Sequence, residues 1–368
     1  MFGVLNRRAL LCPNLNITII KTPSFLHHFS SSKQHSFTTN YLINNFNFSP
    51  ETASTISTRV RLTDSQNPDS ILALFKSHGF TNSQLSRIIQ SYPKLLSSDP
   101  NKTVLPKFNF FLSKGASNSD LVKIVTRNPF VLHLGLETTI TTCYDFLKRF
   151  LVSDESTIRS LKYCTCLIYS KHTSVNVQVL LENGVPESKI AFLLRSCAYS
   201  ACEQPDNFKK AVEEIKEMGF KPNSTVFMVA LSAKMLNAMW ERKIALYKKW
   251  GWSEEVVVSA FARYPWCMLA SEEKIDTMME FLVNRMGWDS LVLSKTPILL
   301  LLSLEKRVVP RSFVLQFLQS RGLVKDVKSA TPFRISEKKF LQKFVNCFEE
   351  EEAAQLLKLY EEKKCRPR

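Results

Sequence analysis

The amino-acid sequence predicts an all-α protein built as a solenoid of helical hairpins. Three observations support this fold class: glycine is scarce, it recurs at a regular interval, and the residues after each glycine follow helical spacing. Only 9 of the 368 residues are glycine, whereas an average usage of about 7% predicts roughly 26. Folds rich in tight turns or phosphate-binding loops are therefore excluded.

Seven of the nine glycines form a series along the chain. Successive members are 36, 69, 35, 32, 36 and 35 residues apart, and the interval of 69 holds two repeats, one of which lacks its glycine. A period of this size indicates stacked pairs of helices. We expect about eight repeats between residues 69 and 345, punctuated by Gly79, Gly115, Gly184, Gly219, Gly251, Gly287 and Gly322.

Each repeat has the signals of two helices and a closing turn. The glycine ends the first helix, and the apolar residue after it is typical of a Schellman motif. Apolar residues 6, 9 and 10 positions after the glycine, such as Leu121, Ile124 and Val125, predict a second helix that is buried on one face. A proline closes this helix, since it cannot continue one. The closing prolines are Pro93, Pro129, Pro265 and, in a shorter repeat, Pro297.

The two ends of the chain differ from the repeats in composition. Residues 1–50 contain no Asp or Glu but contain Arg7, Arg8, Lys21 and Lys33, which is typical of an organellar transit peptide, with a disordered arm as the alternative. We expect a linker over residues 51–68, repeats over 69–345, and an acidic then basic C-terminal helix or tail over 346–368. The longest apolar run is too short to span a membrane.

With the repeat defined, the sequence resembles the mitochondrial transcription termination factor (mTERF) family, of the plant organellar type. Four segments carry the resemblance: Gly79 through Tyr92-Pro93-Lys94-Leu95-Leu96, Gly115 through Asn128-Pro129-Phe130-Val131-Leu132, Gly251-Trp252 through Tyr264-Pro265, and Ser303 to Arg311. Pentatricopeptide repeats share the period, but their recurrent Tyr-Asn pattern is missing from the first helices. Tetratricopeptide repeats have regular Trp, Leu-Gly and Tyr positions that this sequence lacks.

The resemblance implies hairpins of two α-helices and a short 3₁₀ turn, wound into a curved superhelix with a basic concave groove. It also implies nucleic-acid binding in mitochondria or chloroplasts. The roles known in the family include transcription termination or initiation, RNA splicing and ribosome assembly.

The charge of the chain also favours a nucleic-acid partner. The formal net charge is +16, and removing the four positive charges of the first fifty residues leaves +12. Residues 8 and 12 positions after the glycine lie opposite the buried face of the second helix and are basic in several repeats, although a merely solvated basic face is the alternative for any one of them. Two further basic stretches lie at residues 240–250 and 304–343. We predict phosphate contacts from Arg87, Lys123, Arg127, Lys243, Lys249, Arg263, Arg307 and Arg311, the last two also on the family resemblance.

The sequence indicates neither catalysis nor a bound cofactor. It contains no phosphate-binding GxxxxGK loop, no HExxH and no GxSxG. The nine cysteines include no CxxC pair. Cys164 and Cys166 could ligate a metal together with His172, but reduced core thiols are the favoured interpretation, and we predict no metal site.

These observations predict a monomeric protein of the mitochondrion, with the chloroplast as the alternative. It is expected to regulate transcription or RNA maturation by occupying double-stranded DNA or structured RNA, together with organellar transcription or ribosomal machinery. The alternative function is a protein-interaction or ribosome-assembly scaffold of the helical-repeat type.

Overall fold

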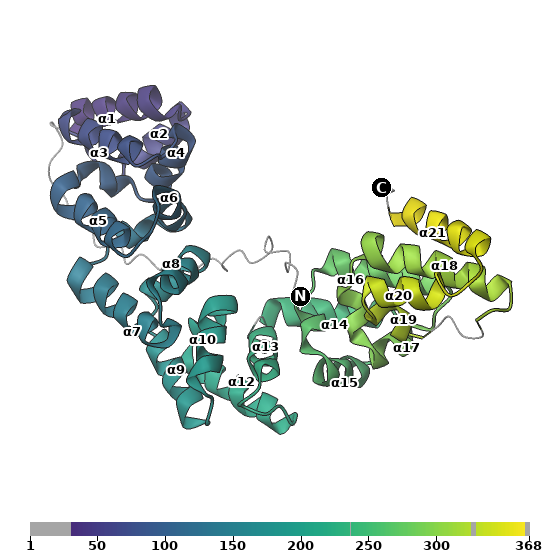
Figure 1. The fold of residues 1–368 in the computed structure, drawn as a ribbon. Helices are drawn as coiled ribbons and strands as arrows, with labels where there is room; N and C mark the ends of the chain where they lie inside the picture. The colour runs from purple at the N-terminus through teal and green to yellow at the C-terminus, as the bar shows by residue number, and fades with distance from the viewer. Residues whose placement is uncertain (1–30, 236, 325–328, 365–368) are drawn as a thin grey trace. The chain divides into compact units, whose positions relative to one another are not determined.

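The computed structural model describes residues 31–235, 237–324 and 329–364, and this part of the chain is helical, with no β-strand (Figure 1). The predicted all-α repeat architecture is confirmed. The chain divides into an N-terminal part, residues 31–212 with 222–228, and a C-terminal part, residues 213–221 with 229–364. None of the described helices combines the length and apolar character that a membrane span requires.

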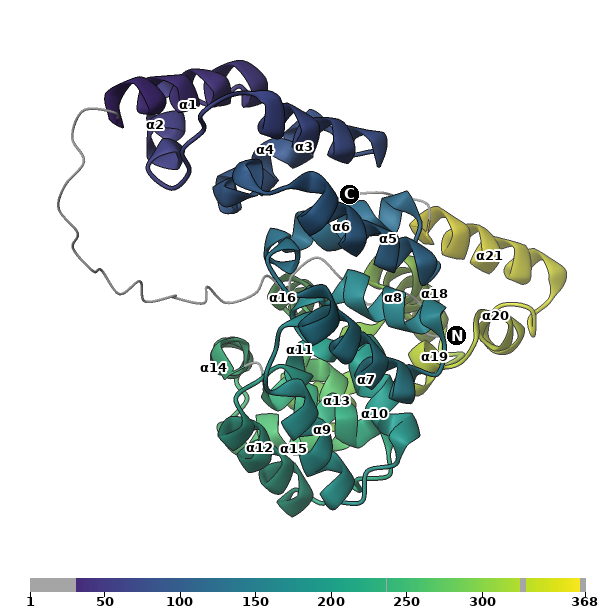
Figure 2. The same ribbon diagram turned by 90° about the vertical axis from the view of Figure 1, so that its left-hand side faces the viewer.

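In the N-terminal part, each hairpin pairs a first helix with a second helix and ends in a short closing turn. The second helices α4, α6, α8 and α10 pack side by side in chain order (Figures 1 and 2). Two π-helical segments, η2 (Pro100–Val104) and η4 (Leu136–Thr141), lead into first helices. The hairpins are α3 (Gln66–Ser77), α4 (Asn82–Ser91) and η1 (Pro93–Ser97); α5 (Leu105–Ser113), α6 (Asn118–Arg127) and η3 (Pro129–Leu132); α7 (Thr142–Leu151), α8 (Asp154–Tyr163) and η5 (Thr165–Ile168); α9 (Thr173–Glu182), α10 (Glu187–Ser196) and α11 (Ala198–Ala201).

The C-terminal part continues the same pattern. Helices α12 (Pro205–Glu217) and α13 (Thr225–Lys234) contain residues of both parts. The later elements are α14 (Asn237–Lys249), α15 (Glu254–Arg263) and η6 (Pro265–Met268); α16 (Glu272–Met279), η7 (Glu280–Arg285), α17 (Ser290–Lys295) and η8 (Pro297–Leu301); η9 (Leu304–Val308), α18 (Val309–Ser320) and α19 (Thr331–Arg334); and α20 (Glu337–Phe344) and α21 (Glu350–Lys364). Helix α21 packs along α18 with Leu356 and Tyr360 buried, so the acidic C-terminal helix belongs to the core of this part.

The structure differs from the predicted boundaries at the N-terminal end. Residues 31–57, expected as transit peptide, disordered arm and linker, form α1 (Ser31–Phe46) and α2 (Pro50–Ser57), which pack against each other. The Tyr41 hydroxyl donates to Asp69 at 2.6 Å, and the buried Leu42 lies on the same side of α1 as Phe46. Apolar residues at helical spacing therefore extend the fold upstream of the first glycine. The rest of the expected transit peptide, residues 1–30, lies outside the described residues.

The repeat glycines end the first helices in the left-handed conformation. All seven have φ between +64° and +86°, a region that glycine enters without steric cost. In the first repeat the Gly79 N–H donates to Lys76 O at 3.0 Å and the Phe80 N–H to Phe75 O at 3.2 Å, which is the Schellman pattern. The apolar residue after the glycine is buried in six repeats, and Leu323 is the exception at 49% exposure.

The repeat without a glycine uses a strained residue at the same point. Val152 ends α7 with φ +69° and ψ −41°, and the Ser153 N–H donates to Leu151 O at 2.8 Å. This is a γ-turn of the classic type, which is rare and strained, and a β-branched residue at positive φ is an outlier. Because the Val152 side chain is 80% exposed, burial of the side chain does little to offset the strain.

A polar side chain of the first helix binds the end of the closing turn in one repeat after another; we call this contact the latch. The last carbonyls of a helical turn have no partner inside the turn, and these ends are packed against the first helix. Asn67 donates to Leu96 O and Ser98 O at 3.2 and 2.9 Å, and Asn176 to Ala201 O and Glu203 O at 3.1 and 2.7 Å. The other latches are Lys107 to Leu132 O, Cys143 to Leu167 O, Lys243 to Met268 O, Lys274 to Leu301 O and Arg311 to Pro332 O, Phe333 O and Ile335 O.

The latch corrects two of the predicted phosphate contacts. Lys243 and Arg311 are 0% and 1% exposed, and Lys243 Nζ and Arg311 Nη1 donate to backbone carbonyls. The Arg311 guanidinium also stacks over the Phe340 ring, 4.7 Å from its centroid. The prediction that these two residues contact nucleic acid is wrong, because a basic residue inside a repeat can be used to satisfy the closing turn.

Replacing Val152 with glycine should stabilise the protein. A glycine at this position avoids the steric cost of the left-handed conformation, roughly 1–2 kcal/mol. Part of this gain is cancelled because glycine also raises the conformational entropy of the unfolded chain. We expect V152G to raise the free energy of unfolding by about 0.5–1 kcal/mol, measured by urea unfolding. The mirror variant G115V should lose about 1–2 kcal/mol, because the φ of Gly115 is +82° and no atom obstructs an added Cβ there. A V152G protein that is less stable than wild type would disprove the strain.

Burial of Lys243 should make stability depend on pH. Desolvation lowers the pKa of Lys243 from 10.5 to about 8, so between these values the unfolded chain holds a proton that the folded protein has released, and stability rises with pH. Between about pH 7 and about pH 9.5, the free energy of unfolding of the wild type should rise by about 1–2 kcal/mol relative to that of a K243M variant. The matched control is K249M, at an exposed position of the same helix; its difference from wild type should stay constant over this range.

Candidate nucleic-acid interface

Two predicted contacts lie exposed on neighbouring second helices. Arg87 on α4 and Lys123 on α6 occupy the same repeat position, eight residues after Gly79 and Gly115, and α4 packs against α6. Both side chains are exposed, and neither makes an ion pair with a described residue. Their positive charges are therefore available to an anionic partner.

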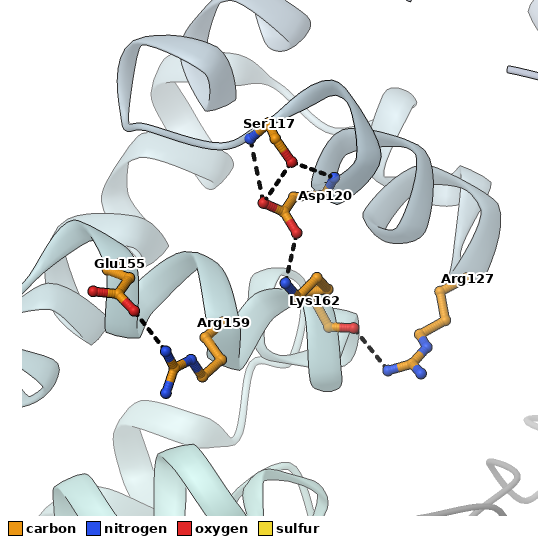
Figure 3. Close-up of polar contacts among 6 residues, drawn as sticks. All are labelled: Ser117, Asp120, Arg127, Glu155, Arg159 and Lys162. Atoms are coloured by element: carbon orange, nitrogen blue, oxygen red, sulfur yellow. Dashed lines mark hydrogen bonds and ion pairs between the residues drawn. The ribbon is translucent and has the colours of Figure 1, made fainter. Parts of the chain in front are cut away.

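The basic residue four positions later has a structural partner instead. Arg127, at the end of α6, donates from Nη1 to Lys162 O at 2.7 Å and to Tyr163 O, the last carbonyls of α8 (Figure 3). Arg59 binds Gln90 O and Ser91 O at the end of α4 in the same way, at 3.3 and 3.1 Å. Arg263 reaches Ser294 O at 3.4 Å. A cation at a helix C-terminus is favourable, so these arginines join successive second helices while remaining exposed.

An ion pair joins α6 and α8 at a second point (Figure 3). Asp120 closes a capping box with Ser117 at the start of α6 and accepts from Lys162 Nζ at 2.5 Å. The hydrogen bond from Lys162 lowers the pKa of Asp120 to about 2, and the capping hydrogen bonds from Ser117 add to this effect. The Asp120 and Lys162 side chains are only 21% and 33% exposed, so this pair is better shielded from solvent than the other ion pair in the same view, Arg159 with Glu155.

The remaining predicted residues lie in the C-terminal part. Lys249 is exposed at the end of α14, and Arg307 is half-buried in η9. Lys243 and Arg311 are buried in latches. The structure thus leaves Arg87, Lys123 and Lys249 as exposed cations without an ion pair to a described residue, and it uses Arg127 and Arg263 to bind a neighbouring helix.

A row of aromatic side chains along the closing turns was missed by the sequence analysis. The Tyr92 hydroxyl lies 3.2 Å from His133 Nδ1, and the His133 ring is 5.2 Å from that of Phe130, which in turn is 6.1 Å from Tyr169. These residues come from the ends of three consecutive repeats, and Phe130 is 44% exposed. The available signal was an aromatic residue, Phe130, directly after its closing proline, a position that Lys94 occupies in the preceding repeat and Trp266 in a later one.

The fold is that of a helical-hairpin repeat protein with exposed cations on its second helices and a row of aromatic side chains along its closing turns. The mTERF family model matches residues 72–246 and 228–341, which together cover most of the chain. The chain belongs to the mTERF family, as its resemblance indicated. Organellar, transcription-related nucleic-acid binding is a property at the level of this family.

One curated relative is similar over much of the chain. It is the mitochondrial transcription termination factor MTERF15 of Arabidopsis thaliana, 24% identical over 250 residues. The match covers 68% of this chain and 48% of the relative, so the chain spans about half the length of the curated relative it matches. The relative is mitochondrial, in agreement with the predicted mitochondrial localisation.

Removing the carboxylate of Asp120 should destabilise the N-terminal part. The D120N variant loses a partly buried charged hydrogen bond and weakens a capping box, so we expect a loss of about 1–2 kcal/mol at neutral pH. Because the pKa of Asp120 is lowered in the folded protein, this contribution is present above about pH 4 and is lost as the pH falls toward 2. Urea unfolding of D120N and wild type at several pH values measures both effects.

The control for this prediction is E155Q in the neighbouring pair. The Arg159 and Glu155 side chains are 65% and 80% exposed, and exposed pairs one helical turn apart contribute only about 0.3–0.5 kcal/mol. Equal losses in E155Q and D120N would contradict the distinction between the two pairs.

Proposed function

We propose that this protein acts in mitochondrial transcription or RNA maturation by binding nucleic acid on the exposed face of its second helices. The observation that carries the proposal is the exposed position of Arg87 and Lys123 at equivalent sites on the packed helices α4 and α6. The net charge of +16 supports it, as does membership of the mTERF family.

Phosphate contact is the function that suits this face best. Neutralising phosphates with Lys and Arg releases condensed counterions, and the affinity gained is independent of base sequence. Arg127 and Arg263 also contribute in our proposal. A guanidinium has five N–H groups, so each side chain can bind a neighbouring helix and still donate to a phosphate. Lys249 and Arg307 extend the contacts in the C-terminal part.

The aromatic row adds a second kind of contact. Tyr92 and Phe130 belong to the same repeats as the exposed Arg87 and Lys123, and a half-exposed ring can stack on an unpaired base. Stacking of this kind favours single-stranded or structured RNA over an intact duplex. We propose that the protein acts by occupying its target and not by chemistry on it.

Salt titration tests the phosphate contacts. Affinity of the full chain for random-sequence duplex DNA and for single-stranded RNA should fall linearly on a plot of log affinity against log salt. The R87Q/K123Q variant should have a slope shallower by about 1.4–1.8, because each lost contact contributes about 0.7–0.9. Fluorescence anisotropy at several salt concentrations measures the slope.

The matched control removes two exposed lysines from first helices of the same part. The K76Q/K209Q variant changes the net charge equally, on α3 and α12, and should keep nearly the wild-type slope. Identical slopes for the two variants would show that α4 and α6 are not the contact face. A wild-type chain that binds neither probe would overturn the proposed function and favour a protein-interaction scaffold. A loss of RNA but not duplex affinity in F130A would show that Phe130 stacks on bases.

A further inference from the structure

Three cysteine sulfurs converge where the closing turns of two adjacent repeats meet. Cys164 ends α8, Cys166 lies in η5, and Cys202 follows α11 one repeat later. The Sγ atoms of Cys164 and Cys166 are 2.8 Å apart, and those of Cys166 and Cys202 are 3.2 Å apart. All three sulfurs lie within 4.8 Å of one another. These separations are well beyond the roughly 2.05 Å of a disulfide bond.

The protein encloses most of this cluster. Cys164 is fully buried and the other two cysteines are half-buried. The Cys202 Sγ also lies 3.7 Å from the Thr173 hydroxyl oxygen. Three thiolates gathered in a largely buried cluster would carry a negative charge that a bound cation compensates best.

We propose that Cys164, Cys166 and Cys202 form a binding site for a soft, thiophilic cation, Zn²⁺ or Cu⁺. Thiolates are the preferred ligands of both ions. Zn–S bonds of about 2.3 Å in tetrahedral geometry place sulfurs about 3.8 Å apart, which lies between the shortest separation here and the 4.8 Å limit. Three protein sulfurs leave a fourth zinc position to water.

The sequence suggested His172 as the partner of Cys164 and Cys166, but in the structure Cys202 lies in the position of the third ligand. The three residues belong to the closing turns of two successive repeats, and the latches of Cys143 and Asn176 hold these same turns. A metal ion here joins the two repeats covalently through its ligands. We therefore expect the ion to stabilise the N-terminal part, and a role in catalysis is not implied.

Metal titration of the reduced full chain tests the site. After purification with reductant and chelator, we expect the protein to bind one Zn²⁺ or one Cu⁺ per chain, in competition with a chromogenic chelator. Thermal unfolding should shift upward with added metal, as linkage requires. Affinity should fall as the pH is lowered, because the thiols must release protons to bind. Co²⁺ serves as a spectroscopic probe, and its sulfur-to-metal charge-transfer absorption should indicate three thiolates.

Cysteine variants locate the site. C166S and C202S should lose the tightly bound ion and the thermal shift, whereas C347S, at an exposed cysteine of the C-terminal part, and C267A, at a buried one, should keep both. Circular dichroism establishes that each variant is folded. If C166S and C202S fail to fold, the test rests on the Co²⁺ spectrum of the wild type, in which charge-transfer absorption from thiolate sulfur is expected.

Three results would overturn the proposal. The reduced wild type could bind neither ion above the level of C202S, or bind Co²⁺ without sulfur charge transfer. Alternatively, C166S and C202S could retain wild-type affinity for Zn²⁺ and Cu⁺. Any of these would mean that the cluster is a set of packed thiols. None of these outcomes depends on nucleic-acid binding, so the site is tested separately from the proposed function.

Discussion

The fold depends on satisfying the carbonyls at the end of each closing turn. A 3₁₀ turn that follows a proline ends in backbone acceptors without partners in the turn, and stacking of the hairpins buries them. A donor from the first helix of the same repeat solves this problem. The donors differ in kind, from the amide of Asn67 to the ammonium of Lys243 and the guanidinium of Arg311. What recurs is the contact itself, a donor of the first helix bound to the last carbonyls of the closing turn.

Basic residues accordingly serve two purposes in this protein. Some are buried donors in latches. Others, Arg127 and Arg263, bind the C-terminal end of the second helix in the following repeat and so hold two repeats together. Others, such as Arg87 and Lys123, point away from the core and have no ion-pair partner among the described residues. A net charge of +16 therefore overstates the charge offered to a partner, and the exposed second-helix positions are the part of it that bears on function.

The closing turns also concentrate the other chemical groups of interest. The aromatic row from Tyr92 to Tyr169 and the cysteine cluster both lie there. The reason is geometric, since closing turns of successive repeats are neighbours and bring residues about 35 positions apart into contact. An array of this kind can gather side chains of several repeats at its closing turns without any long loop.

The sequence by itself determined the fold class, the family, the repeat period and the helix ends. Glycine at a left-handed position, an apolar residue after it and a closing proline are local requirements of the backbone, so they can be recognised without neighbours. Only the tertiary structure decided which cations are exposed, that residues 31–57 are folded, that Val152 replaces a glycine, and that Cys202 meets Cys164 and Cys166. These features depend on contacts between repeats, and a lysine in a latch has the same local sequence signature as a lysine on the surface.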